Sequence, residues 1–222
     1  MNLYFEVLQK CPLFQDITEE NLLTMLDCLQ VKTGRYEKGQ TIFAEGEPAK
    51  FFGILLTGAA KIVRVDYYGN RSIVASLEPA QIFGESFACA KIEALPVDVV
   101  AAENTEVLLI DARRILQSCS HACSFHNQMI FNLLKVVATK NLVFHQKLEI
   151  TSKRSTREKL MTYLLLQAKY HHSNSFIIPY DRQELADYLE VERSGLSAEI
   201  SKLRREGILE CRRSQFTLLS SG

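Results

Sequence analysis

The sequence has no apolar run that reaches the roughly 18 residues of a membrane-spanning helix, although 47% of its 222 residues are hydrophobic. The first ten residues, MNLYFEVLQK, have neither a basic start nor a long apolar core, so we expect no export signal and a cytoplasmic protein. The six cysteines do not follow the spacing of a disulfide framework, and we expect reduced thiols. No internal repeat is present. These absences exclude membrane-spanning, disulfide-stapled and repeat proteins, and leave a chain long enough for two domains or one large domain.

The sequence also lacks net charge, with 26 Lys and Arg residues against 26 Asp and Glu residues. The balance hides an asymmetry. Residues 150–222 hold 12 basic and 9 acidic side chains, whereas residues 1–149 hold 14 basic and 17 acidic ones. The small basic excess therefore lies in the C-terminal third, where phosphate contacts would require it.

Residues 181–209, DRQELADYLEVERSGLSAEISKLRREGIL, carry the most informative pattern. Apolar residues at helical spacing predict two short helices, with Leu185, Ala186 and Leu189 on the first and Leu196, Ile200 and Leu203 on the second. Asp181 can cap the first helix, the second begins near Arg193, and Glu190–Glu192 connects them. Gly207 and a basic hairpin follow. This order predicts a winged helix-turn-helix. The alternative is an ordinary helical hairpin in a core.

The first half of the chain has the pattern of short strands with frequent turns, after an amphipathic helix at residues 13–29. Strands at about ten-residue spacing favour an antiparallel jelly roll or barrel, and another antiparallel sandwich is the alternative. The fold class is therefore α+β. The expected strands are Gln40–Ala44, Phe51–Leu56, Ala60–Val65, Ser72–Leu77, Val97–Ala102 and Glu106–Ile110.

Helical character returns near Arg113 and persists to Tyr170, with a hinge at Lys153–Arg157 and Thr156 as the cap of the following helix. Residues alternating four and three apart form one stripe of a long helix. It predicts a parallel homodimer, and packing of the helix on its own domain is the alternative. The stripe is Ile130, Leu134, Val137, Asn141, Phe144 and Leu148. We expect domains at residues 1–123, 124–150 and 151–222.

Two stretches carry a resemblance to a known family. Residues 39–65, GQTIFAEGEPAKFFGILLTGAAKIVRV, are similar to the glycine-spaced first half of the cyclic-nucleotide-binding jelly roll of the Crp/Fnr transcription regulators. Residues 181–209 are similar to the winged helix-turn-helix of that family. The resemblance covers nearly the whole chain. It implies a homodimeric, sequence-specific regulator that binds an inverted repeat of double-stranded DNA, contacts RNA polymerase if it is an activator, and is not an enzyme.

By this resemblance, Arg193 would donate to a guanine edge. Ala198 departs from the family pattern, because many relatives have another arginine there, so one base pair of the half-site should differ. The expected DNA contacts, in the groove or on phosphates, are Arg182, Gln183, Glu192, Arg193, Ser194, Ser197, Arg212 and Arg213. For any single arginine, a solvated surface charge is the alternative.

The expected effector pocket includes Phe83, Gly84, Glu85, Ser86, Phe87, Leu95, Pro96 and Val97. Its first half resembles the phosphate-binding cassette of the family, which needs an arginine about ten residues later. No arginine occurs between Arg71 and Arg113, and Lys91 is the one basic residue between them. We therefore expect no cofactor and an effector other than cyclic AMP, preferably a small and partly apolar metabolite. A nucleotide-binding module without DNA is disfavoured by the same missing arginine and by the helix-turn-helix.

The remaining candidate chemistry is weaker. Cys119 and Cys123, spaced four apart beside His121 and His126, could with Cys89 bind a metal or haem or sense redox state, and buried packing is the alternative. Iron–sulfur members of the family use a close N-terminal cysteine cluster, whereas this N-terminus has Cys11 alone. No metal site is therefore assigned. Residues 84–88 loosely match a nucleophile elbow, but the αβα pattern that such a turn needs is absent.

Overall fold

The computed structural model describes residues 4–116 and 124–219, and divides into two compact units. Unit 1 comprises Met1–Val65 and Val74–Asn141, and unit 2 comprises Asp66–Ile73 and Leu142–Gly222. The predicted domain boundaries at residues 123 and 150 stay predictions. Within the described ranges, no helix combines the length and apolar character needed to cross a bilayer.

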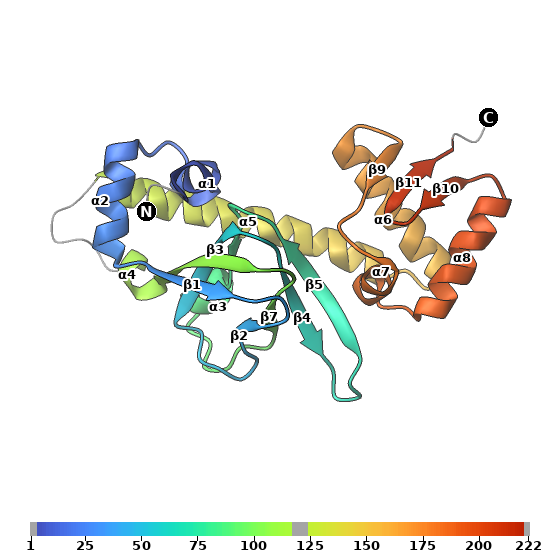
Figure 1. Cartoon of the computed structure of the whole chain (residues 1–222), viewed down its shortest axis with the longest axis horizontal. Coiled ribbons are helices and arrows are strands. Elements are labelled where there is room, and N and C mark those ends of the chain that lie inside the picture. Colours follow the sequence, from blue (N-terminus) through green and yellow to red (C-terminus); the bar gives the residue numbers. More distant parts are fainter. Residues whose placement is uncertain (1–3, 117–123, 220–222) are drawn as a thin grey trace. The chain divides into compact units, whose positions relative to one another are not determined.

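The elements in chain order (Figure 1) are α1 (Phe5–Lys10), the 3-10 helix η2 (Pro12–Phe14), α2 (Glu19–Leu29), β1 (Lys32–Tyr36), β2 (Thr41–Phe43), β3 (Phe51–Thr57), β4 (Ala60–Val65), β5 (Arg71–Leu77), β6 (Ile82–Phe83), α3 (Glu85–Cys89), β7 (Asp98–Ala101), β8 (Thr105–Asp111), α4 (Ala112–Leu116), α5 (Ser124–Thr151), α6 (Thr156–His171), β9 (Ser175–Ile177), α7 (Arg182–Leu189), α8 (Arg193–Arg205), β10 (Leu209–Arg212) and β11 (Gln215–Leu218).

Two four-stranded antiparallel sheets contain strands β1 to β8, in the orders β1-β8-β3-β6 and β2-β7-β4-β5. Their inner faces share one apolar cluster, to which Ile42 and Val99 contribute from one sheet and Leu55 and Val107 from the other. The predicted antiparallel α+β architecture is confirmed. Strands β1 and β6 were not predicted.

Strand β3 is buried on both faces, which explains its unbroken apolar sequence FFGILL. Leu55 enters the cluster between the sheets, whereas Phe52 and Ile54 pack into a second cluster with the N-terminal helices and α5. Gly53 permits the close approach of β6, because a Cβ atom there would lie 2.1 Å from the Phe83 ring.

The first half of α5 packs into this second cluster through Met129, Leu133 and Val136. Asn132 is buried on the same side, and its amide donates to the carbonyls of Leu13 (3.1 Å) and Gln15 (2.7 Å). The opposite side of α5 is therefore left outside this core.

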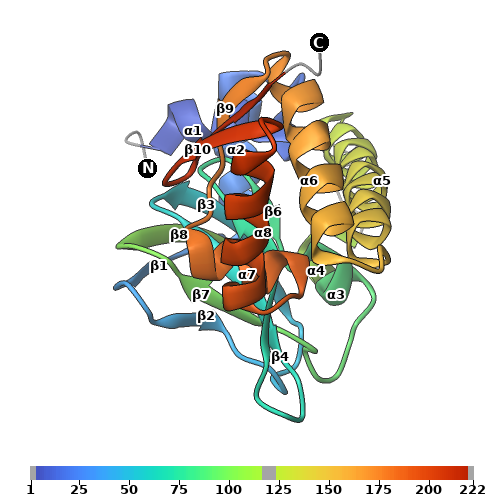
Figure 2. The same cartoon turned by 90° about the vertical axis from the view of Figure 1, so that its right-hand side faces the viewer.

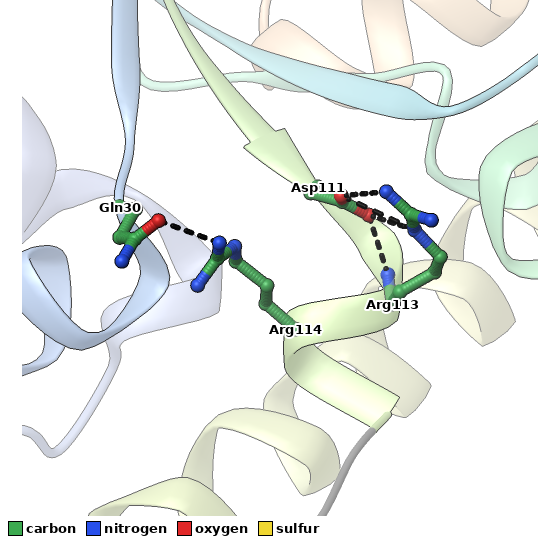
Figure 3. A network of polar contacts seen from close by, with 4 residues as sticks. All are labelled: Gln30, Asp111, Arg113 and Arg114. Atoms are coloured by element: carbon green, nitrogen blue, oxygen red, sulfur yellow. Dashed lines mark hydrogen bonds and ion pairs between the residues drawn. The ribbon is translucent and has the colours of Figure 1, made fainter.

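Polar contacts join two neighbouring arginines of α4 to the end of α2 and to the end of β8 (Figure 3). Gln30 ends α2 in the left-handed region at φ 47°, and its Oε1 accepts from Nη2 of Arg114 at 2.5 Å. Nη2 of Arg113 lies 2.7 Å from Oδ2 of Asp111. Hydrogen bonding from Arg113 holds the pKa of Asp111 below its ordinary value. The network fixes the chain where it leaves the sheet for α4.

Unit 2 contains α6, α7 and α8 with the three-stranded sheet β10-β11-β9. Helix α8 packs on both α6 and α7, and β10 contacts α8. A hairpin beside two crossed helices is a winged helix-turn-helix, as predicted.

Three details of the helices differ from the predictions. The helix expected over residues 13–29 begins at Glu19, because Pro12–Phe14 form a separate 3-10 turn. In its described residues, the helical region from Arg113 to Tyr170 comprises α4, α5 and α6, and the predicted hinge falls between α5 and α6. Ser155, not Thr156, caps α6, because its hydroxyl accepts from the Glu158 N–H and Glu158 completes the capping box.

Candidate nucleic-acid interface and effector site

The helix-turn-helix is built as its sequence pattern predicts. The Asp181 side chain accepts from the Glu184 N–H, and the Glu184 side chain accepts from the Asp181 N–H. Glu190 ends α7 in the left-handed region at φ 54°, and α8 begins at Arg193. The six predicted apolar positions of the two helices are all buried: Leu185, Ala186, Leu189, Leu196, Ile200 and Leu203. Packing through this face turns the polar side of α8 outward.

The outward side begins at the start of α8. Glu192, Arg193 and Ser194 are exposed, and Ser197 is half-buried. Arg193 forms no ion pair or side-chain hydrogen bond with any other residue that the structure describes. Its guanidinium is therefore available to a partner such as a base edge.

The two predicted contacts at the start of α7 lie differently. The Nη2 of Arg182 lies 3.4 Å from Sγ of Cys211, and its guanidinium lies 5.8 Å from the centre of the Phe216 ring. Its Nη1 is buried without a partner among the described residues. Gln183 is exposed, and its amide donates to Oδ1 of Asp187 at 2.8 Å. Arg182 thus packs against the β10–β11 hairpin, and its predicted phosphate contact stays a prediction.

The wing is the β10–β11 hairpin, in which Arg212 pairs with Gln215. Arg212 and Arg213 are both exposed at its turn, and Arg213 lies in the left-handed region at φ 53°. The Ser214 hydroxyl donates to the Tyr180 carbonyl at 2.9 Å. This bond ties the wing to the segment before α7.

Arg157 supports the recognition helix from α6, a role that the sequence did not reveal. Its Nη1 lies 3.3 Å from Oε1 of Glu199, and its Nη2 lies 2.6 Å from Oε2 of Glu206. The Arg157 hydrogen bond holds the pKa of Glu206 below its ordinary value. One guanidinium thus forms ion pairs with the middle and the end of α8. The sequence cannot predict these ion pairs, because they depend on how α6 packs against α8.

The predicted effector residues fall into two environments. Phe83 is fully buried between the sheets, with its ring 5.3 Å from that of Phe43, and Glu85 is 2% exposed. Leu95 and Val97 are buried, whereas Ser86 and Pro96 are exposed. Gly84, at φ 78°, and the half-buried Phe87 lie beside Glu85 on or before α3. These residues therefore lie on strand β6, on or just before α3, and in the segment before β7.

Lys140 of α5 is the cation of this region, and sequence reasoning missed it. Its Nζ lies 2.9 Å from Oε1 of Glu85 and also donates to the Ile82 carbonyl. The Oδ1 of Asp98 accepts from the Glu45 N–H at 2.7 Å. This cation comes from α5, 55 residues from Glu85, and not from the jelly-roll strands.

The thiols and imidazoles that the structure describes form no assembled ligand set. Cys119, Cys123 and His121 lie outside the described residues. Burial raises the pKa of the Cys89 thiol, and the buried His126 ring lies 2.9 Å from the Ile115 carbonyl. In the ranges 4–116 and 124–219, no three His, Cys, Asp or Glu side chains converge on a metal-sized site.

The stripe predicted along α5 is largely uncovered. Leu134 and Leu148 are 64% and 63% exposed, Phe144 is 48% and Ile130 is 40% exposed. Asn141 is exposed and Val137 is half-buried. Apolar side chains this exposed along one helix typically mark a partner surface.

Comparison with known proteins matches both units. Residues 33–122 match the family model of the cyclic nucleotide-binding domain, and residues 158–220 match that of the Crp-like helix-turn-helix domain. The transcriptional activator FnrA of Stutzerimonas stutzeri is 24% identical over 86% of this chain and 78% of its own. FnrL of Cereibacter sphaeroides is 26% identical over 81% and 73%. The cGMP-dependent protein kinase 2 of Rattus norvegicus is 24% identical, but this chain covers 26% of it.

Solved structures agree on the fold. FixK2 from Bradyrhizobium japonicum superposes with a TM-score of 0.65 at 22% identity, over 86% of this chain and 93% of that one. The c-di-GMP-responsive regulator CLP of Xanthomonas campestris superposes with a TM-score of 0.68 at 16% identity, over 89% and 98%.

Proposed function

Because the chain belongs to the Crp/Fnr family of transcription regulators, we propose that it binds an inverted repeat of double-stranded DNA as a homodimer. Regulators of this family bind DNA through the helix-turn-helix and carry an effector-sensing domain. They are not enzymes. Arg193 and its exposed neighbours on α8 are the proposed base-reading residues.

The uncovered stripe of α5 carries the proposal of a homodimer. A lone chain would leave Leu134, Phe144 and Leu148 in water, at a cost that scales with their apolar area. A second copy of the helix, packed in parallel, covers the same residues and places Asn141 opposite its counterpart. A paired Asn in such a seam favours one register and two strands. The dimer then supplies one α8 to each half-site.

Two-fold symmetry fixes the expected operator. The half-site centres should lie about 34 Å apart, one turn of DNA. Selection of binding sites from random duplexes by the purified protein should return an inverted repeat with this spacing. Sedimentation with a labelled duplex should give two chains per site. An asymmetric site that holds one chain contradicts the proposal.

The proposed effector binds near the Phe83–Phe87 and Leu95–Val97 segments and is a small, partly apolar metabolite rather than cyclic AMP. Leu95 and Val97 offer apolar surface, and the Glu85–Lys140 pair offers a polar anchor. Native mass spectrometry of the purified protein tests for a retained molecule. If the regulator is an activator, as FnrA and FnrL are by name, RNA polymerase is its second partner.

A further inference from the structure

A basic hollow lies beside the far end of the recognition helix. It has a volume of about 480 Å³ and is lined by Ser201, Arg204 and Arg205 of α8 and by Leu209 and Glu210 of β10. Figure 2 shows α8 facing the viewer, with β10 crossing beside its upper end. No contact predicted from the sequence falls on these residues.

The basic hollow continues the outward face of α8. Ser194, Ala198, Ser201 and Arg205 recur at spacings of four, three and four, so they share one side of the helix, and all four are exposed. The proposed base-reading end and the basic hollow are therefore two ends of one surface.

The length of α8 takes this surface to the DNA backbone. Its 13 residues span roughly 20 Å, whereas the major groove is about 12 Å wide. Recognition helices of this motif contact base edges with their N-terminal residues, so α8 inserted in this way brings its last turn towards the edge of the groove, where phosphates lie.

The arginines of the hollow are available for such a phosphate. Arg204 and Arg205 are exposed, and neither forms an ion pair or side-chain hydrogen bond with another described residue. Glu206, the nearest acidic residue along the chain, is held by Arg157 at 2.6 Å. The Ser201 hydroxyl donates to the Ser197 carbonyl, so the guanidinium groups are the donors. A guanidinium matches the geometry of a phosphate and can bind it through two parallel bonds.

Two features oppose an anion here, and their size decides the balance. The C-terminus of a helix carries about half a negative charge, and Glu210 adds a carboxylate on the β10 side. Two guanidinium groups exceed both together, so the phosphate should lie on the α8 side of the hollow.

We propose that Arg204 and Arg205 bind one phosphate of the DNA backbone at the edge of the groove entered by α8. This inference rests on the proposed DNA-binding function and extends its interface beyond the base-reading residues and the wing. Because the contact is to the backbone, it strengthens binding to any sequence and carries no base preference.

The test is the salt dependence of DNA binding by the full chain. Each phosphate contact contributes about 0.9 to the slope of log affinity against log salt, so loss of one per subunit should lower a dimer's slope by about 1.8. Arg204→Gln with Arg205→Gln should show this drop, with a roughly tenfold or greater loss on operator and random DNA alike. Glu210→Gln should strengthen binding to both, and Lys169→Gln, which changes an exposed cation of α6, should leave the slope unchanged.

The outcomes separate the two proposals. Wild-type protein without salt-dependent operator binding contradicts the proposed function. A normal wild-type slope that the double variant retains overturns the inference alone. If the variant binds DNA normally but loses activation with purified RNA polymerase, the hollow is a protein contact and the phosphate assignment is wrong. Far-UV circular dichroism establishes that each variant is folded.

Discussion

The Nζ of Lys140 lies 2.9 Å from Oε1 and 3.0 Å from Oε2 of Glu85, so one lysine of α5 neutralises a buried carboxylate of the proposed effector site. Lys140 is next to Asn141 and three residues from Val137. The same turn of helix thus carries both the ion pair and the predicted dimer seam. A ligand that disturbs Glu85 would act directly on the helix that presents this seam.

Breaking this pair should destabilise unit 1. Lys140→Met leaves the Glu85 charge buried without a cation, and removing one partner of a buried pair costs about 3–5 kcal/mol. Because the Lys140 side chain is 30% exposed, we expect a loss at or below the lower end. Glu85→Gln in the Lys140→Met background should restore most of it. Urea unfolding of the four proteins of this double-mutant cycle measures the coupling, and additive losses would show that the pair contributes nothing.

Arg193→Ala should cost roughly 1–3 kcal/mol at the selected operator and relax base choice at one position of each half-site. Random DNA should be bound almost as tightly as by wild type, because no phosphate contact is removed. Arg212→Ala is the matched control, since loss of a wing contact should weaken operator and random DNA alike. Equal losses on both DNAs for Arg193→Ala would show that Arg193 does not read a base.

Leu134→Glu with Val137→Glu should convert the proposed dimer into a monomer, because both substitutions place charges in the predicted seam opposite their symmetry mates. Thr139→Glu is the control, since Thr139 is exposed on the other side of α5. Sedimentation of the three proteins distinguishes the states. A dimer that survives the double substitution would mean that another surface joins the chains.

The sequence predicts best where one local period dominates. The α7–α8 pair and strand β4 lie where their patterns place them, because apolar spacing and the Asp181 cap fix each locally. Strand β1, KTGRY, was not predicted. It is polar and its side chains are exposed or half-buried, so it has no alternating apolar pattern. Such a strand forms by pairing with β8 and carries little local signal.

The sequence indicates which residues of the proposed site are exposed, but not which residues they contact. Exposure of Arg193 follows from the helical pattern. The Lys140–Glu85 pair and the grip of Arg157 on Glu199 and Glu206 join residues far apart in the chain. Spacing cannot reveal such pairs, because they depend on how helices and sheets pack.

The thiol of Cys11 should be unreactive towards alkylating reagents in the folded protein. It is 1% exposed, and burial raises the pKa of its thiol to about 12. Since the thiolate is the nucleophile, native protein should label at Cys28, which is exposed, long before Cys11. The raised pKa also links folding to pH. The contribution of protonated Cys11 to stability is fully present below about pH 9. It should be lost as the pH rises towards 12, because the Cys11 thiol of the unfolded chain ionises first. Peptide mass spectrometry after iodoacetamide gives both rates. Equal labelling in native buffer would contradict the burial, and equal labelling in denaturant is the control.

Cyclic AMP and cyclic GMP should not raise the affinity of the protein for its operator. A cyclic phosphate carries a full negative charge, and burying it without a cation costs several kcal/mol. Lys140 is the nearby base, but Glu85 already holds it. Moving Lys140 to a phosphate would leave the Glu85 carboxylate, which is 2% exposed, without its cation.

Isothermal titration with each cyclic nucleotide, paired with operator binding at saturating nucleotide, tests this expectation. Tight binding that enhances operator affinity would contradict it. The Lys140→Arg variant should be titrated in parallel. A guanidinium has five N–H donors, so the arginine could bind Glu85 and an anion together. If Lys140→Arg alone gains a response to cyclic nucleotides, the Lys140–Glu85 ion pair is what prevents their binding to the wild-type protein. No response in either protein would place it in the arginine-free segment from Leu95 to Val97 as well.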